Sequence, residues 1–328
     1  ITRQIPQSGI ILLQNHVILE IWDQSEPPPY SILLEKVANI EGLLCLLTDK
    51  IDQKLIDNAP GLKVISQMAV GYDNIDIKAA TNQGILIGNT PGVLTEATAD
   101  LTWALLMAIT RKITEGQEYI KQGKWTTWQP MGLLGADFVG STLGIIGLGR
   151  IGQAVARRAK GFNLNILYHN RHRLDVNLEQ ELGVKYVSLE ELLQESDFIT
   201  LHTPLTDNTY HLIGSNELKL MKKTAFLINT ARGQILNQNA LHHALIEGEI
   251  AGAALDVTDP EPLPSNHELL QLNNVIITPH IGSASYETRS RMAIIAAQNL
   301  LAGLQGKPLV SCVNPDVYHI NKPRLPSD

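Results

Sequence analysis

Three residues that can bind anions or move protons follow short apolar runs in the second half of the chain: Arg232 after residues 225–229, Glu261 after residues 252–257, and His280 after residues 275–278. Each run is typical of a buried strand. In a parallel sheet the carboxyl ends of the strands meet at one edge, where ligands bind. Taken singly, these residues would be a loop arginine, an exposed glutamate and a capping histidine. Because all three are expected at the same edge of the sheet, a shared catalytic or binding site is the favoured interpretation.

The three residue types suit hydride transfer to a small 2-oxo acid. A hydride that reaches C2 leaves an alkoxide that needs a proton, and histidine titrates near neutrality. A carboxylate on the other ring nitrogen orients the imidazole and favours its protonated form. Arginine can hold the substrate carboxylate and polarise its carbonyl. We therefore predict that His280 is the acid/base, Glu261 its partner and Arg232 the substrate clamp.

A glycine turn indicates where the hydride carrier binds. The segment Leu143-Gly-Ile-Ile-Gly147-Leu-Gly149-Arg-Ile-Gly152 reads as a strand, a tight turn and the start of a helix. In such a turn the glycines allow the bend, the approach of the pyrophosphate and close helix–strand packing, and the helix N-terminus holds the anion. The pattern predicts that a dinucleotide contacts Gly147, Leu148, Gly149, Arg150, Ile151 and Gly152.

The end of the next predicted strand favours NADP(H), with NAD(H) possible. An NAD enzyme usually places an acid there to bind the ribose 2′-hydroxyl. This chain reads Tyr168-His-Asn170-Arg171-His172-Arg173, with no acid before Asp175. An arginine suits a 2′-phosphate. Arg171 is the first candidate, assisted by Asn170 and Arg173, with His172 in the same segment. A solvated basic loop is the alternative.

The elements that must position these residues form two α/β series. The first contains predicted strands at residues 43–47, 62–68 and 85–88, with Asp52 capping a helix and another helix at residues 75–82. A long helical stretch at residues 96–122 follows, and the second series adds strands at residues 143–147, 165–168 and 198–201 to the three named above. Caps at Ser188 and Asn237 and a final helix at residues 287–304 complete it. This alternation predicts parallel, doubly wound sheets.

Composition narrows the class of protein. Of the 328 residues, 44% are hydrophobic and 18% are charged, as in ordinary globular proteins. A net charge of −7 argues against a nucleic-acid partner, and no apolar run is long enough to span a membrane. Two unpaired cysteines without a signal peptide favour the cytoplasm. We expect no metal site, because no cluster has ligand spacing. Since the sequence begins at Ile1, we expect that a few native residues precede it.

Together these motifs resemble the D-isomer-specific 2-hydroxyacid dehydrogenases along nearly the whole chain. The markers are Leu148-Gly-Arg-Ile-Gly152, His202-Thr-Pro-Leu-Thr206, Asn229-Thr-Ala-Arg-Gly233, Leu255-Asp-Val257 with Glu261-Pro262, and Pro279-His280-Ile-Gly-Ser283. The resemblance implies the arginine, glutamate and histidine roles given above and a D-acid product. It also implies a Rossmann cofactor domain at residues 98–285, inserted into a smaller flavodoxin-like substrate domain at residues 1–97 and 286–328.

Further contacts follow from the same resemblance. Asp256 matches the residue that holds the nicotinamide carboxamide, and Ala69-Val70-Gly71 matches the loop whose N–H groups receive the substrate carboxylate. A homodimer formed through the cofactor domain is also implied. The remaining expected cofactor contacts, besides Arg232 and His280, are His202, Thr203, Pro204, Thr209, Thr230, Ala231 and Ser283.

Within this family the chain looks most like the glyoxylate/hydroxypyruvate reductases, which implies NADPH-dependent reduction to glycolate or D-glycerate. One departure concerns Met131-Gly132-Leu-Leu134, where animal members have a tryptophan, so the preference between the two substrates is open. We expect Trp125 and Trp128 to be packing anchors. The alternatives are a D-lactate or phosphite type of dehydrogenase, or an NAD(P)H-sensing corepressor-like binding protein.

Overall fold

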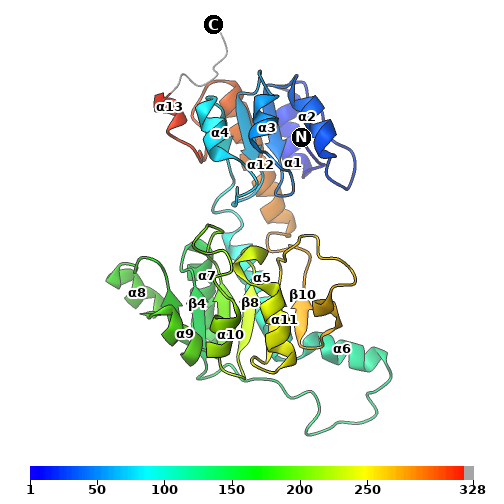
Figure 1. The fold of residues 1–328 in the computed structure, drawn as a ribbon, viewed down its shortest axis with the longest axis vertical. Coiled ribbons are helices and arrows are strands. Elements are labelled where there is room, and N and C mark those ends of the chain that lie inside the picture. Colours follow the sequence, from blue (N-terminus) through cyan, green and yellow to red (C-terminus); the bar gives the residue numbers. More distant parts are fainter. Residues whose placement is uncertain (321–328) are drawn as a thin grey trace. The chain divides into compact units, whose positions relative to one another are not determined.

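The computed structural model describes residues 1–320 and divides into two compact units. One unit contains Ile1–Leu94 and the chain from Ala284 onward, and the other contains Thr95–Ser283. Figure 1 shows the elements of each unit. In the described part of the chain, no helix has both the length and the apolar character that crossing a bilayer requires.

The Thr95–Ser283 unit is built on a seven-stranded sheet in the order β10-β9-β8-β7-β4-β5-β6, in which every pairing is parallel. The strands are β4 Thr142–Ile146, β5 Asn165–His169, β6 Lys185–Tyr186, β7 Phe198–Leu201, β8 Phe226–Asn229, β9 Gly252–Leu255 and β10 Val275–Ile277. The sequence predicted six of these strands. The two-residue β6 was missed because so short an element has no periodicity.

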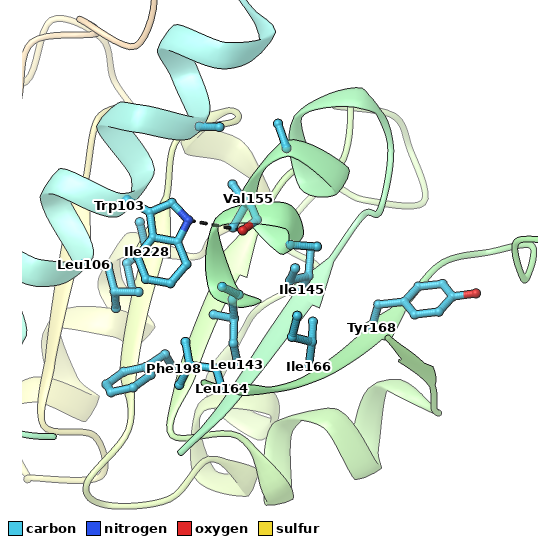
Figure 2. Close-up of a cluster of buried hydrophobic side chains, with 14 of the residues drawn as sticks. Trp103, Leu106, Leu143, Ile145, Val155, Leu164, Ile166, Tyr168, Phe198 and Ile228 are labelled. Carbon is cyan, nitrogen blue, oxygen red and sulfur yellow. Dashed lines mark hydrogen bonds between the residues drawn. The ribbon is translucent and has the colours of Figure 1, made fainter. Parts of the chain in front are cut away.

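Helices cover both faces of this sheet. The helices of this unit are α5 Thr95–Thr110, α6 Ile113–Lys121, α7 Arg150–Ala159, α8 Val176–Leu182, α9 Leu189–Glu195, α10 Ser215–Leu220 and α11 Gln238–Ile246, with 3-10 turns at Lys160–Phe162, Gly233–Ile235 and Glu268–Gln271. Of these, α6 has no buried residue and does not contribute to the cover. One core cluster joins α5 and α7 to the sheet, and a second joins α9, α10 and α11. Figure 2 shows the first cluster, where the buried Trp103 indole donates to the Val155 carbonyl at 3.2 Å.

The other unit has a smaller parallel sheet in the order β1-β2-β3. Its strands are β1 Gly42–Cys45, β2 Val64–Gln67 and β3 Leu86–Gly88, and its helices are α1 Gln7–Gln14, α2 Tyr30–Val37, α3 Gln53–Asp57, α4 Ile77–Asn82, α12 Tyr286–Leu304 and α13 Val317–Ile320. Thr2 N donates to Leu44 O at 3.1 Å and Trp22 N to Ile1 O at 2.9 Å, so two extended segments lie beyond β1. The lateral order of these two segments and of the strands β1, β2 and β3 is that of a flavodoxin-like 2-1-3-4-5 sheet.

The predicted helix caps are confirmed, but the single long helix at residues 96–122 is wrong. Asp52, Ser188 and Asn237 each accept from a backbone N–H in the first turn of their helix. The long stretch breaks between α5 and α6, where Lys112 has a φ of 51°. The reason is a distant contact: Ala136 N donates to Thr110 O at 3.1 Å and thereby takes the carbonyl that the next helical turn would need.

Candidate active site

The glycine turn joins β4 to α7 and has space for a ligand. Gly147 has a φ of 96°, and a Cβ there would lie 2.7 Å from His202 C, so both its conformation and its neighbour require glycine. A Cβ on Gly152 would lie 2.3 Å from Gly147 O. Gly149 differs, because a Cβ there would meet no protein atom within 4 Å. The open space beside Gly149, at the start of α7, fits a dinucleotide pyrophosphate.

The loop after β5 is fixed by its own polar contacts. Asn170 Oδ1 accepts from Leu148 N at 2.6 Å and so ties this loop to the glycine turn. Arg173 pairs with the buried Glu179 through Nε at 2.8 Å and Nη2 at 2.7 Å, and the Tyr168 hydroxyl donates to Glu179 at 2.5 Å. Arg173, which was expected to assist Arg171, is thus paired with Glu179 of α8 in this structure.

These contacts also set the charges of the loop. The bonds from Arg173 and Tyr168 lower the pKa of Glu179 to about 2, so it stays ionised. Burial and then Glu179 raise the pKa of Tyr168 to about 12. Arg171 is exposed, and no hydrogen bond or ion pair within residues 1–320 involves its side chain. Among the predicted 2′-phosphate residues, Arg171 is the guanidinium that remains available.

His202 directly follows β7, and its backbone lies against Gly147. Its Nε2 and the Thr203 hydroxyl are buried, and neither has a hydrogen-bond partner in the described structure. Burial lowers the pKa of His202 to about 3, so this imidazole is neutral at physiological pH. Pro204 follows, and its carbonyl accepts from the Thr209 hydroxyl at 2.6 Å, so Thr209 shapes the turn after β7.

Arg232 lies in a tight loop after β8 that neighbouring residues clamp. The buried Asn229 accepts from Ala231 N at 3.0 Å and donates to Arg232 O at 2.8 Å. Thr230 is held through its hydroxyl, 2.9 Å from that of Thr102 in α5. A Cβ on Gly233 would lie 2.0 Å from Thr258 O, so glycine is needed to pack this loop against the segment that carries Glu261.

His280 and Glu261 form a direct pair. His280 Nδ1 lies 2.5 Å from Glu261 Oε1, and the two side chains are 27% and 36% exposed. Burial alone would raise the pKa of Glu261, but the hydrogen bond and charge of His280, together with the charge of Arg232, outweigh burial and lower it. Glu261 is therefore ionised, and the other ring nitrogen of His280, Nε2, remains for a ligand. We refer to Arg232, Glu261 and His280 as the Arg–Glu–His edge.

Asp256 holds the backbone that carries His280. Its buried carboxylate accepts from the Thr278 hydroxyl at 2.6 Å, Ile281 N at 2.8 Å and Gly282 N at 2.7 Å. His280 has a φ of 54°, a left-handed conformation that costs a non-glycine residue free energy. Burial raises the pKa of Asp256 despite these bonds. The carboxylate expected to face the nicotinamide thus also grips the loop from Thr278 to Gly282, with Ser283 next in the chain.

The predicted substrate-binding residues Val70 and Gly71 belong to the other unit and follow β2. Both are half-buried. With Ala69 they form a short segment, the 69–71 loop, whose carbonyls face protein donors. Sequence reasoning missed the residues that support the three loops: Asn229 for the Arg232 loop, Thr278 for the His280 loop and Asn89 for the 69–71 loop. The only sign of them in the sequence is that each is a polar residue in or directly after a predicted buried strand. Within residues 1–320 no group of His, Cys, Asp or Glu side chains is arranged to hold a metal ion.

Comparison with known proteins places this geometry in a family. Residues 103–282 match the model of the D-isomer specific 2-hydroxyacid dehydrogenase NAD binding domain. The chain is 51% identical to a glyoxylate reductase of Korarchaeum cryptofilum over 98% of this chain and 97% of that protein. It is 52% identical to a glyoxylate reductase of Thermococcus litoralis over 98% of both.

Solved structures agree. The TT0316 protein from Thermus thermophilus superposes with a TM-score of 0.90 at 46% identity, over 95% of this chain and 98% of that one. An NADPH-dependent glyoxylate/hydroxypyruvate reductase from Sinorhizobium meliloti, in complex with NADP and malonate, superposes with a TM-score of 0.85 at 31% identity over 95% and 96%. The parallel fold and the extent of these matches show that this chain is an oxidoreductase of the D-isomer specific 2-hydroxyacid dehydrogenase family.

Proposed function

We propose that the protein is an NADPH-dependent glyoxylate/hydroxypyruvate reductase that produces the D-2-hydroxy acid. The observation that carries the proposal is the His280–Glu261 pair beside the Arg232 loop, at the edge of a dinucleotide-binding sheet. Relatives named glyoxylate reductase, about half of whose residues are identical to this chain, support the substrate class. The gap left at Gly149 supports the cofactor class.

The chain's own residues divide the work as follows. When bound, the nicotinamide cofactor supplies the hydride that joins C2 of the substrate. Arg232 binds the substrate carboxylate and polarises the C2 carbonyl. His280 donates a proton from Nε2 to the substrate oxygen, because Nδ1 is engaged by Glu261 at 2.5 Å. Glu261 stays ionised and orients the ring.

Selection of NADPH is assigned to the loop after β5. Arg171 presents an exposed guanidinium where a ribose 2′-phosphate would bind, and it has no carboxylate partner in the described part of the chain. Charge-assisted contacts of arginine with phosphate are among the stronger hydrogen bonds in proteins. The Sinorhizobium meliloti relative, described as NADPH-dependent, supports this assignment.

We also propose a homodimer formed through the segment that follows α6. Trp125 is 66% exposed, Trp128 80% and Met131 78%, so the expectation that both tryptophans are packing anchors fails within one chain. Clustered exposed apolar residues are typical of interfaces. A second copy would bury them. We place this dimer in the cytoplasm, since both Cys45 and Cys312 carry free thiols.

Steady-state kinetics with a panel of 2-oxo acids and both cofactors tests the proposal. Glyoxylate, hydroxypyruvate and pyruvate would each be offered with NADPH and with NADH. We expect the highest kcat/KM with NADPH and glyoxylate or hydroxypyruvate. Preference for pyruvate would favour a D-lactate type of enzyme, and tight NADPH binding without turnover on any acid would favour a sensing protein. Gly132 lies in the segment where animal members have a tryptophan, which leaves the preference between the two substrates open. The ratio of kcat/KM for glyoxylate to kcat/KM for hydroxypyruvate measures that preference.

A further inference from the structure

The 69–71 loop has all three of its carbonyls occupied by protein donors. Thr90 N donates to Ala69 O at 2.9 Å. The side-chain amide of Asn89 donates to Val70 O at 2.9 Å, and that of Gln67 donates to Gly71 O at 3.3 Å. The peptide groups of this loop are therefore turned so that their oxygens face the protein.

The opposite side of the loop carries the N–H groups. Within the described structure no protein acceptor is paired with the N–H of Val70 or Gly71. Successive backbone N–H groups that point the same way form an anion-binding concavity. Turning the carbonyls inward thus exposes the groups that a carboxylate needs.

Asn89 is held in one orientation by residues from the far end of the chain. Ser311 Oγ donates to Asn89 Oδ1 at 2.7 Å, which leaves the Asn89 NH₂ to face Val70 O. The buried Asn299 of α12 donates to Asn89 O at 2.9 Å and accepts from Ser311 N at 3.1 Å. A Cβ on Gly88 would lie 2.8 Å from the Asn299 side chain, so glycine lets α12 approach this closely.

We propose that Asn89, oriented by Asn299 and Ser311, is a positioning residue that sets substrate affinity by holding the Val70 and Gly71 N–H groups toward the substrate carboxylate. This inference rests on the proposed function, in which the substrate is a 2-oxo acid, and on the family resemblance, which implies that the 69–71 loop receives the substrate carboxylate together with Arg232. The inference extends the substrate site to a network of uncharged polar groups, formed by Asn89, Asn299 and Ser311, behind the loop. The network acts on the KM for the 2-oxo acid and leaves the cofactor untouched.

Asn89→Ala tests the proposal against a matched control, Asn314→Ala. Asn314 is another buried amide in this unit, and it bonds Ile87 N, Ile85 O and the Thr81 hydroxyl without touching the 69–71 loop. We expect Asn89→Ala to raise the KM for glyoxylate about tenfold or more, as loss of hydrogen bonds to a charged group does, with little change in kcat and in the KM for NADPH. Asn314→Ala should lower the melting temperature without this KM change.

Ser311→Ala keeps the test valid if Asn89→Ala does not fold. It removes one hydrogen bond from Asn89 and should raise the KM for glyoxylate by a smaller factor in the same direction. Equal KM values for glyoxylate in the wild type, Asn89→Ala and Ser311→Ala would overturn the inference, as would an equal rise in Asn314→Ala. A wild-type protein that reduces no 2-oxo acid would instead refute the proposed function, so the two failures are distinguishable.

Discussion

The Arg–Glu–His edge and the 69–71 loop use opposite means of offering polar groups to a ligand. The edge presents charged side chains, and its histidine is kept in a left-handed backbone conformation by a buried carboxylate. The loop presents backbone N–H groups, and uncharged amides hold it from behind. The edge can move protons, whereas the loop can only bind. The comparison assigns the chemical step to the edge, where Arg232 also contacts the substrate, and gives the loop a role in substrate binding alone.

Removing the proton donor should cause the largest loss. We expect His280→Ala to lower kcat by about 10²–10⁴-fold, the usual contribution of a general acid, with little change in the Kd for NADPH. Single-turnover oxidation of NADPH with glyoxylate measures this directly. Near wild-type turnover would remove His280 from the chemistry and erase the contrast between the two regions.

The second largest loss of activity is expected when the hydrogen bonds that hold the backbone beside His280 are weakened. Asp256→Asn has one acceptor oxygen where the carboxylate serves two backbone N–H groups and a hydroxyl. We expect kcat to fall about tenfold to hundredfold, because a small misplacement of a reacting group is costly. Thr278→Val removes only the hydroxyl donor and should cost less. Equal losses in both variants would show that the grip on the 281–282 backbone is unimportant.

The preference for NADPH over NADH should depend on one arginine in the loop after β5. We expect Arg171→Ala to raise the KM for NADPH about tenfold, on the scale of one charge-assisted contact, while the KM for NADH stays unchanged. Arg173→Ala is the informative companion, since Arg173 is bound to Glu179 and its loss should lower the melting temperature instead. A parallel rise for both cofactors in Arg171→Ala would take it out of the 2′-phosphate site.

The smallest effect is a pH dependence of stability that, of the two regions compared, only the Arg–Glu–His edge should show. The pKa of Glu261 is lowered in the folded protein, so its ionised form stabilises the fold above the ordinary value of about 4.3 and the benefit is lost as the pH falls below it. We expect Glu261→Gln to lower the free energy of unfolding by about 1 kcal/mol or less near neutrality, with the difference shrinking in acid. Denaturant titrations across pH measure it. Asn89→Ala should show no such trend, because its amides do not titrate.

What could be predicted from the sequence follows the same division. Charged residues after apolar runs and glycines in a strand–turn–helix pattern are local signals, and they led to His280, Glu261, Arg232 and the β4–α7 turn. The support of the 69–71 loop could not be predicted, because Asn89 and Ser311 are 222 residues apart. The break at Lys112 was missed for the same reason, since it depends on Ala136. Long-range backbone contacts leave no local pattern.

The most direct test of the account follows one hydrogen from cofactor to product. NADPH that carries deuterium at the transferred position would be incubated with hydroxypyruvate, and the glycerate formed would be analysed by NMR and chiral chromatography. We predict D-glycerate labelled at C2 from the wild type and almost none from His280→Ala in the same time. Unlabelled glycerate or the L-isomer would contradict hydride transfer from the cofactor to give the D-acid. Equal yields from the two proteins would contradict the role of His280 as the proton donor of the Arg–Glu–His edge.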